Sequence, residues 1–441
     1  MGGRDKANIR ELILECLMEV LEEGTYSHVI LNAVLNKYAY LPKQDRAFLT
    51  VVFEGTIERL ITIDYILDEF SKTPVRKMKP LIRNLLRSAV YQIVYLDKTP
   101  DSVIVNESVK LAGKRGFKGL QGFVNGLLRN ISRNRSEIRF PEKEGSPVRY
   151  LSVKYSVPEW IVTKFLDEFD FPTVEGILEK SLKRPDTVIR INKNTNIDDL
   201  KKRMEQNGIS MEKTCFSNAF VIKDYDRIAD IPGFSNGEFR IQDLSSVRVG
   251  NLISEYIDLN GKKVLDVCAA PGGKSLHLLD MGANVTACDL SENKTALIKD
   301  NLKQITDQEA LKDIMILEKD AAIHDSSFEN AFDVVLADVP CSGLGVLGRK
   351  ADIKYRLAPE DIDSIVKLQS TILDNVSTYV KPGGLFVFST CTLDPDENEY
   401  HRDRIKNSGD FELLKEELRI PGRDLGDGFY ITIFRKRTEP D

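Results

Sequence analysis

Two cysteines stand in short motifs that combine thiol, hydroxyl and carboxyl groups. Cys341 lies in DVPCSG at 338–343, and Cys391 lies in STCT at 389–392. Each motif follows a short apolar run that predicts a buried strand. A lone cysteine is more often a small buried hydrophobe than a nucleophile. Two cysteines at the strand ends of one sheet, one of them beside an Asp-x-Pro, favour a chemical role.

These groups fit methylation at carbon 5 of a cytosine ring. That carbon is a poor nucleophile, and addition of a thiolate to C6 makes it able to attack a methyl sulfonium. The C5 proton must then leave before the thiol is expelled, so the reaction needs a nucleophilic thiol, an acid at N3 and a group that assists release. Cys391, Asp338 and Cys341 supply this set. Either strand end could present the nucleophile.

A loop of small residues, CAAPGGKS at 268–275, follows the first predicted strand of the C-terminal half. Small residues let a ligand approach the backbone closely at the start of a helix. The loop lacks G-x-G-x-x-G, and the first glycine that a P-loop requires falls on Cys268. We therefore expect a cofactor loop of another kind, with a simple tight turn as the alternative.

Two carboxylates stand at the next strand ends. Asp289 ends the second predicted strand about twenty positions after the loop, where nucleotide-binding folds place a carboxylate for the ribose hydroxyls. Asp320, just past the third strand, could accept a hydrogen bond from an adenine amino group, or be a surface aspartate. The pattern predicts a site for an adenosine-containing cofactor.

The elements that must position these residues alternate between strand and helix. From about Gln242 onward the predicted strands span residues 263–268, 284–289, 314–318, 333–337 and 384–390. This alternation indicates a doubly wound α/β sheet, whose ligands bind beyond the carboxyl ends of the strands.

The part of the chain before residue 242 has a different pattern of apolar residues. Apolar residues recur at helical spacing over 9–21, 81–93 and 123–128, which predicts a helical bundle up to about residue 138. A polar stretch with Pro and Gly at 141–147 predicts a linker. A smaller mixed unit follows, with helices expected over 158–169 and 197–207 and strands over 187–191 and 219–223.

Charge is distributed unevenly along the chain. Residues 1–140 hold 22 Lys and Arg against 16 Asp and Glu, so the net charge of this part is +6. Since the net charge of the whole chain is −6, the remaining residues carry −12. We expect a phosphate-binding surface there, with a merely solvated basic face as the alternative. The basic residues concerned are Lys72, Arg76, Lys77, Lys79, Arg83, Arg87, Lys98, Lys110, Lys114, Arg115, Lys118, Arg129, Arg133, Arg135 and Arg139.

The composition restricts the class of protein to which this chain can belong. With 441 residues, 42% hydrophobic and 29% charged, the chain has the composition of a globular protein of about three domains. The six cysteines form no C-x-x-C pair and the four histidines no close ligand pair, so we expect no metal site. We see no membrane span or signal peptide and expect a cytoplasmic protein.

The catalytic motifs resemble those of the Sun family of RNA (cytosine-5)-methyltransferases: CAAPGGK at 268–274, DVPCSG, STCT, and QDLSS at 242–246. The resemblance implies S-adenosylmethionine as methyl donor, Cys391 as nucleophile and Cys341 as the aid to release, with Lys274 near the target base. It implies that the cofactor is bound by Cys268, Ala269, Ala270, Pro271, Gly272, Gly273, Lys274, Asp289, Asp320 and Asp338.

The N-terminal segments DSVIVNESV at 101–109 and GFVNGLLR at 122–129 resemble the RNA-binding domain of the NusB family. Together with the catalytic motifs they resemble the bacterial 16S rRNA methyltransferases of the RsmB/Sun/Fmu type. That type implies 16S rRNA as partner, cytosine 967 as target and a monomer. We expect a multidomain protein: an all-α NusB-like bundle at 1–140, a small α/β RRM-like domain at 145–238, and a Rossmann-like class I methyltransferase domain at 239–441.

Two other functions stay open from the sequence. A transfer-RNA cytosine-5 methyltransferase would use the same catalytic motifs, although the helical N-terminal part favours rRNA. A nonenzymatic antitermination or assembly factor could retain the fold, but it would be expected to have lost one of the two cysteine motifs.

Overall fold

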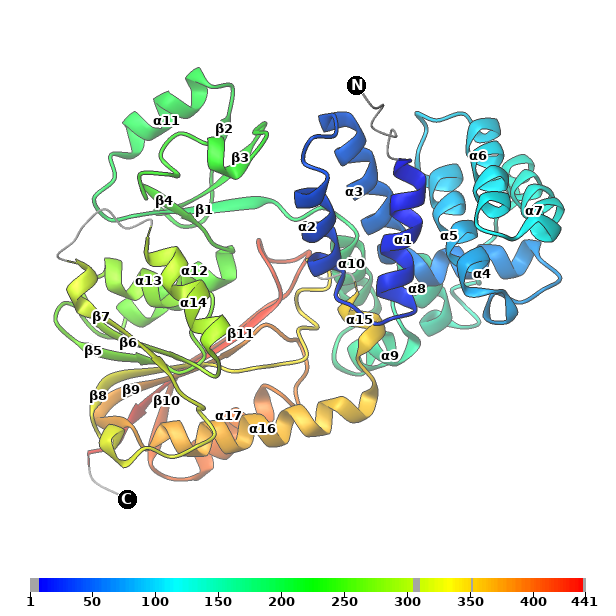
Figure 1. Ribbon diagram of the computed structural model, residues 1–441. Helices are drawn as coiled ribbons and strands as arrows, with labels where there is room; N and C mark the ends of the chain where they lie inside the picture. The colour runs from blue at the N-terminus through cyan, green and yellow to red at the C-terminus, as the bar shows by residue number, and fades with distance from the viewer. Residues whose placement is uncertain (1–7, 304–309, 350–351, 439–441) are drawn as a thin grey trace. The chain divides into compact units, whose positions relative to one another are not determined.

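The computed structural model describes residues 8–303, 310–349 and 352–438, and its contacts divide the chain into two compact units (Figure 1). One unit comprises Met1–Leu182 and Lys350–Arg356, and the other comprises Lys183–Arg349 and Leu357–Asp441. The first contains only helices among its regular elements, and the second contains both sheets of the described chain.

The helical unit is organised around α5. This helix begins at Pro80, whose fixed φ and missing N–H suit a first helical turn, and its apolar face packs with α1, α4, α6 and α7 in one core. The bundle predicted for this part is confirmed. Its helices are α1 (Ile9–Leu21), α2 (Ser27–Lys37), α3 (Lys43–Glu58), α4 (Leu60–Phe70), α5 (Pro80–Tyr95), α6 (Asp101–Lys114), α7 (Gln121–Arg133), α8 (Pro147–Tyr155), α9 (Glu159–Glu168), α10 (Phe171–Ser181) and α15 (Ile353–Arg356).

The short helix α15 comes from the second half of the chain but is built into the helical unit. Asp352 accepts a hydrogen bond from the Ser27 N–H at the start of α2 (3.0 Å). Lys354 donates to the Glu58 carbonyl at the end of α3 (3.0 Å). Lys354 is 2% exposed, and burial lowers its pKa to about 7. The chain that leaves the DVPCSG motif thus enters the helical unit before it continues as α16 (Pro359–Ser377).

The second unit begins with a four-stranded antiparallel sheet of order β2-β3-β1-β4, packed against α11. Alternate residues of its strands face this small core, which gives β1 and β3 their apolar patterns. The elements are β1 (Thr187–Ile191), α11 (Ile197–Gln206), β2 (Ser210–Lys213), β3 (Ala219–Lys223) and β4 (Phe239–Ile241). The small α/β domain predicted here is confirmed.

A seven-stranded sheet follows, of order β10-β11-β9-β8-β5-β6-β7. The five strands from β9 to β7 in this order run parallel, whereas β11 and β10 pair antiparallel at one edge. This is the Rossmann-like arrangement expected. The strands are β5 (Lys263–Asp266), β6 (Asn284–Asp289), β7 (Ile314–Glu318), β8 (Phe332–Asp338), β9 (Val380–Thr390), β10 (Phe411–Arg419) and β11 (Phe429–Lys436).

Helices cover both faces of this sheet (Figure 1). Val264 packs in the core with α12 (Leu244–Ser254), α13 (Gly273–Asp280) and α14 (Glu292–Leu302). Its neighbour Leu265 packs in the core with α16 and α17 (Glu399–Asn407) on the opposite face. Because both faces of the central strands β5 and β8 are buried, these strands are nearly continuous apolar runs rather than alternating ones.

The observed elements differ from the predicted ones in instructive places. The strand predicted over 263–268 ends at Asp266, because the chain leaves the sheet there to form the loop before α13. The sequence does not predict β10: its residues FELLKEELR are rich in helix formers, and pairing with β11 makes it a strand. The domain limits stay predictions, and α8–α10 lie in the helical unit rather than with the small sheet.

Among the described residues, no helix is long and apolar enough to cross a lipid bilayer.

Arg190 of β1 joins the small sheet to helix α13 and gives a stability prediction. It is 1% exposed, and its guanidinium contacts Asp280 (2.5 Å) and Gln242 (2.9 Å). Arg190→Met should destabilise the second unit by about 3 kcal/mol, the low end for removing one partner of a buried ion pair, since Asp280 keeps some contact with water. The melting temperature of this unit should fall by roughly 6–12 °C.

The matched control is Arg227→Met, which removes an arginine from the exposed pair with Asp230. This control should leave the melting temperature nearly unchanged. Equal melting temperatures for the Arg190 and Arg227 variants in a thermal scan would contradict the role given to Arg190.

Candidate active site

The carboxyl ends of four parallel strands place polar side chains along one edge of the large sheet. β5 ends at Asp266, β6 at Asp289, β8 at Asp338 and β9 at Thr390. In the β8–β9 pairing Asp338 lies opposite Ser389, so the two cysteine motifs begin side by side. This edge is where ligands bind in doubly wound sheets.

The loop between β5 and α13 carries the small residues 268–273. Gly272 has φ +103°, which favours glycine, and a Cβ atom there would lie 3.2 Å from the Ile298 side chain. The Ala269 N–H donates to the Cys288 carbonyl of β6 (2.9 Å), which holds the loop against the next strand. The loop therefore presents backbone with little side-chain cover at the start of α13.

Asp289 is bound to this loop. Its Oδ2 accepts the Ala270 N–H and its Oδ1 the Leu290 N–H, both at 2.8 Å. Lys294 lies 3.1 Å from Oδ1. Asp289 is 4% exposed, and its carboxylate fixes the loop to the end of β6.

Asp266 lies under the same loop and was not singled out from the sequence. Its Oδ2 accepts a hydrogen bond from the Ser275 hydroxyl (2.6 Å), while Oδ1 has no hydrogen-bond partner among the described residues. Burial raises the pKa of Asp266 to about 7. Its position at the end of a strand that runs into the glycine loop was the available signal.

Lys274 and Asp338 form an ion pair with 2.6 Å between Nζ and Oδ2. The Ser389 hydroxyl donates to the other oxygen of Asp338 (2.8 Å), and the Lys274 ammonium lies 5.2 Å from the centre of the Phe429 ring. Burial disfavours the ammonium, but the charge and the hydrogen bond of Asp338, together with the charges of Asp266 and Cys391, outweigh burial and raise the pKa of Lys274. The pair places a cation and a carboxylate next to the cysteines.

The two thiols lie together, with 3.3 Å between the Sγ atoms of Cys341 and Cys391. Both side chains are partly exposed. The hydrogen bond between the thiols, followed by burial and nearby negative charge, raises the pKa of Cys341 well above that of a free thiol. The charges of Lys274 and Cys391 interact favourably. One thiol is thus disposed to hold a proton while the other is stabilised as thiolate by a nearby cation.

A close backbone approach fixes the loop after Cys341 against Cys391. Gly345 donates its N–H to the Cys391 carbonyl (3.0 Å), and its carbonyl accepts the Gly428 N–H (2.8 Å). A Cβ on Gly345 would lie 2.3 Å from the Gly428 oxygen. Only a residue without a side chain at position 345 allows these three chain segments to meet beside the thiols.

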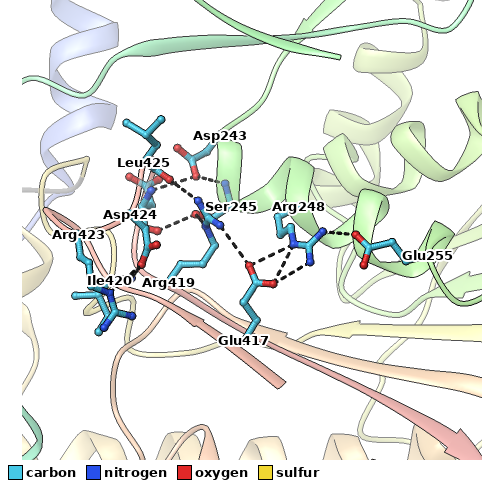
Figure 2. A network of polar contacts seen from close by, with 11 residues as sticks. Asp243, Ser245, Arg248, Glu255, Glu417, Arg419, Ile420, Arg423, Asp424 and Leu425 are labelled. Atoms are coloured by element: carbon cyan, nitrogen blue, oxygen red, sulfur yellow. Dashed lines mark hydrogen bonds and ion pairs between the residues drawn. The ribbon is translucent and has the colours of Figure 1, made fainter. Parts of the chain in front are cut away.

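Side chains of the QDLSS motif belong to a network of polar contacts at the start of α12 (Figure 2). Asp243 caps α12 by accepting the Ser245 N–H (2.8 Å) and pairs with Arg349, which also contacts Asp427. Arg419 donates to the Ser245 hydroxyl (3.2 Å) and to the Leu425 carbonyl (2.7 Å). The motif thereby ties the loop between β10 and β11 to the start of α12.

Arg248 continues the network in Figure 2 to the edge of the sheet. It contacts Glu417 of β10 (3.0 Å) and Glu255 (2.5 Å). These contacts give the QDLSS motif a structural role, because none of its side chains contacts the thiols.

The other residues predicted for the site lie along the same edge. Cys268 is partly exposed at the start of the loop, and burial raises its pKa. Asp320 is exposed after β7, where its Oδ1 accepts the Ala322 N–H (2.9 Å). The backbone N–H of Lys319 donates to the Asp289 carbonyl, which sets Asp320 beside the end of β6. No cluster of three or more metal-ligating side chains occurs in the described part of the chain.

The sequence pattern does not mark a second group of polar residues near the thiols. Gln369, Glu397 and His401 are fully buried behind the thiols, although they are separated along the chain and form no spaced motif. Glu397 stands among the charged residues before α17, a pattern more typical of a helix start.

Known proteins match nearly the full length of this chain. Residues 258–439 match the family of 16S rRNA methyltransferase RsmB/F, and residues 7–133 match the NusB family. A probable ribosomal RNA small subunit methyltransferase B of Bacillus subtilis (strain 168) is 37% identical, with 98% of this chain and 99% of that protein covered. The ribosomal RNA small subunit methyltransferase B of Cronobacter sakazakii is 27% identical over 96% of this chain and 97% of that protein.

Solved structures share the fold. The NSun6 structure from Pyrococcus horikoshii superposes with a TM-score of 0.55 at 18% identity, covering 64% of this chain and 98% of that one. Another crystal structure superposes with a TM-score of 0.79 at 22% identity, covering 98% of this chain and 99% of that one.

The close approach at Gly345 gives a prediction about the thiol pair. Gly345→Ala must move backbone beside Cys391, at a cost of at least about 1–3 kcal/mol for overpacking. The two sulfurs should separate, so that diamide forms the Cys341–Cys391 disulfide several-fold more slowly than in the unchanged protein. Peptide mapping by mass spectrometry measures the rate.

Gly119→Ala is the matched control, since a Cβ there meets nothing within 4 Å. This variant should form the disulfide at the original rate. A Gly345→Ala protein that forms it equally fast would show that the backbone contact does not set the thiol distance.

Proposed function

Since this chain belongs to the RsmB/F family of 16S rRNA methyltransferases, we propose that it methylates carbon 5 of a cytosine in 16S rRNA, with S-adenosylmethionine as donor and Cys391 as nucleophile. The observation that carries the mechanism is the pair of thiols 3.3 Å apart beside the Lys274–Asp338 ion pair. The target we propose is cytosine 967, and the protein acts as a monomer in the cytoplasm, where its rRNA substrate occurs.

The residues at the strand ends fit an adenosine-containing sulfonium. The small loop 268–273 leaves backbone accessible, Gly272 cannot gain a side chain without meeting Ile298, and Asp289 has lone pairs left for ribose hydroxyls. Asp320 and Asp338 stand on either side along the same edge. When bound, S-adenosylmethionine supplies an electrophilic methyl group on a positively charged sulfur.

The proposed reaction begins at Cys391. Its thiolate, favoured by the Lys274 cation, forms a bond to C6 of the cytosine. Asp338 delivers to N3 the proton that it shares with Lys274, which leaves the electrons of the former double bond available at C5.

After C5 has gained its methyl group, the adduct must be resolved. Cys341, whose own thiol proton has passed to water, removes the C5 proton as a thiolate, the C5–C6 double bond re-forms, and the bond between C6 and the Cys391 sulfur breaks. The N3 proton returns to Asp338, which again shares it with Lys274. Cys391 leaves as the thiolate, and the proton remains on Cys341, whose raised pKa makes it a strong base once it is deprotonated.

The basic residues of the helical unit support the RNA part of the proposal. Several are neutralised by ion pairs, among them Arg83, Arg87 and Lys114. By contrast, the cations around the short helix η1 (Val75–Lys77) are exposed and have no ion-pair partner among the described residues. We call Lys72, Arg76, Lys77 and Lys79 the η1 cluster and propose that it binds RNA phosphates.

Cofactor binding provides one test. Asp289→Ala removes the acceptor proposed for the ribose, and hydrogen bonds to charged groups contribute roughly 1.5–3 kcal/mol, so calorimetry should show an affinity loss of about ten- to a hundredfold. Because Asp289 also holds Ala270, Asp289→Asn is the control: it keeps one acceptor oxygen and should lose less affinity. Unchanged affinity in Asp289→Ala would refute the cofactor assignment.

A second test distinguishes the roles of the two thiols. Cys391→Ala should form no covalent bond to RNA and lose turnover while cofactor binding persists. Cys341→Ala should add and methylate but stall as a protein–RNA adduct that survives denaturing electrophoresis. The substrate is a 16S rRNA fragment containing cytosine 967, and bisulfite sequencing of the unchanged enzyme's product reads the methylated position.

The reverse adduct pattern would exchange the roles of the two cysteines. No adduct from either variant would remove support for covalent catalysis, and methylation at another cytosine would refute the proposed target.

RNA binding by the η1 cluster can be tested in the full chain. Changing its four residues to Ala should weaken RNA binding and flatten the plot of log affinity against log salt by roughly 0.7 for each phosphate that the protein no longer neutralises. Cofactor affinity should stay the same. Lys110→Ala, from an exposed pair with Glu107, is the control. If the fourfold variant keeps the original salt slope, the cluster is only a solvated surface.

A further inference from the structure

A buried set of polar side chains lies behind the two thiols, and the proposed chemical steps do not use it. Gln369 comes from α16, Glu397 from the loop between β9 and α17, and His401 from α17. All three are fully buried. Groups of this polarity are costly to bury, so their contacts indicate what they stabilise.

Two of these side chains hold the peptide groups on both sides of Cys341. Gln369 Nε2 donates to the Pro340 carbonyl (2.9 Å), and Glu397 Oε2 accepts the Ser342 N–H (2.9 Å). Gln369 Nε2 also donates to Glu397 Oε2 (2.9 Å), which links the two holders to each other. The backbone of Cys341 therefore cannot turn without breaking at least one buried hydrogen bond.

His401 fixes the orientation of the Gln369 amide. Its Nε2 lies 3.0 Å from Gln369 Oε1, and since an amide oxygen only accepts, Nε2 carries the hydrogen. Burial lowers the pKa of His401 to about 4, so the ring is neutral. With its oxygen bound to His401, the amide must direct its nitrogen toward Pro340 and Glu397.

Glu397 is the side chain in this set with an unused hydrogen-bond acceptor. Its Oε1 has no hydrogen-bond partner among the described residues, and burial raises the pKa of its carboxyl group. A side chain needed only to fill space would be apolar here, since an unpaired buried oxygen is unfavourable. Its other oxygen, Oε2, binds Ser342 directly and Gln369, which in turn binds Pro340 on the other side of Cys341.

We infer that Glu397, acting together with Gln369, is a positioning residue that holds Cys341 where its sulfur can take the C5 proton during product release. This inference rests on the release step proposed above for Cys341. Glu397 exchanges no proton itself. The proton moves from C5 to the Cys341 sulfur, the C5–C6 double bond re-forms, and the bond from C6 to Cys391 breaks.

The test uses full-length protein with the 16S rRNA fragment and S-adenosylmethionine. Glu397→Ala removes the acceptor, so the released product should fall and the covalent adduct should rise by about tenfold, the effect of losing one typical hydrogen bond. Glu397→Gln keeps an oxygen for Ser342 and Gln369 and should restore release. Asp396→Ala, which removes the exposed carboxylate next to it, is the matched control and should behave as the unchanged enzyme.

Each outcome decides the inference. Glu397→Ala without adduct, alongside Cys341→Ala with adduct, overturns the positioning role and leaves the proposed function standing. No adduct from Cys341→Ala contradicts the proposed release step itself. A Glu397→Gln variant that stalls as strongly as Glu397→Ala also overturns positioning by hydrogen bonding.

Loss of folding is tested separately by calorimetric cofactor binding. If Glu397→Ala does not bind S-adenosylmethionine, Gln369→Met replaces it, because methionine conserves the volume and removes both donated hydrogen bonds. Adduct accumulation in Gln369→Met supports the inference, and normal release by this variant overturns it.

Discussion

The parallel pairing of β8 with β9 is the constraint on which the site depends. It sets Asp338 opposite Ser389, so Cys341 and Cys391 leave adjacent strands at nearly the same level. Because neighbouring strands lie only about 4.8 Å apart, two such side chains must meet. The same ladder joins β5 to β8 and brings Lys274, at the start of α13, to the carboxylate of Asp338.

Polar groups surround the thiols in two layers with different physical roles. In front, the Lys274–Asp338 pair is partly exposed and can exchange its contacts with a substrate base. Behind, Gln369 and Glu397 are fully buried and bind backbone groups that water cannot reach. The front layer can therefore respond to a ligand, whereas the rear layer keeps one geometry because any change would leave buried polar atoms unpaired.

Chain continuity links this site to the helical unit. The segment that begins at Cys341 runs within a dozen residues to Asp352, which caps α2 of the helical unit, and to Lys354, whose buried ammonium binds the end of α3. A buried lysine is tolerated only with such partners. Residues 352–356 consequently belong by their contacts to the helical unit, although the sequence places them between β8 and α16 of the catalytic fold.

Local spacing and residue type are enough to predict the alternation of elements, the glycine loop, the carboxylates at strand ends and both cysteine motifs. The tertiary fold makes β10 a strand, since its helix-forming residues extend when β11 supplies backbone partners. It alone revealed Asp266 under the loop and Glu397 behind Cys341. Their environment comes from chain segments far apart in sequence, and burial with hydrogen bonding acts through space and leaves no periodic pattern along the chain.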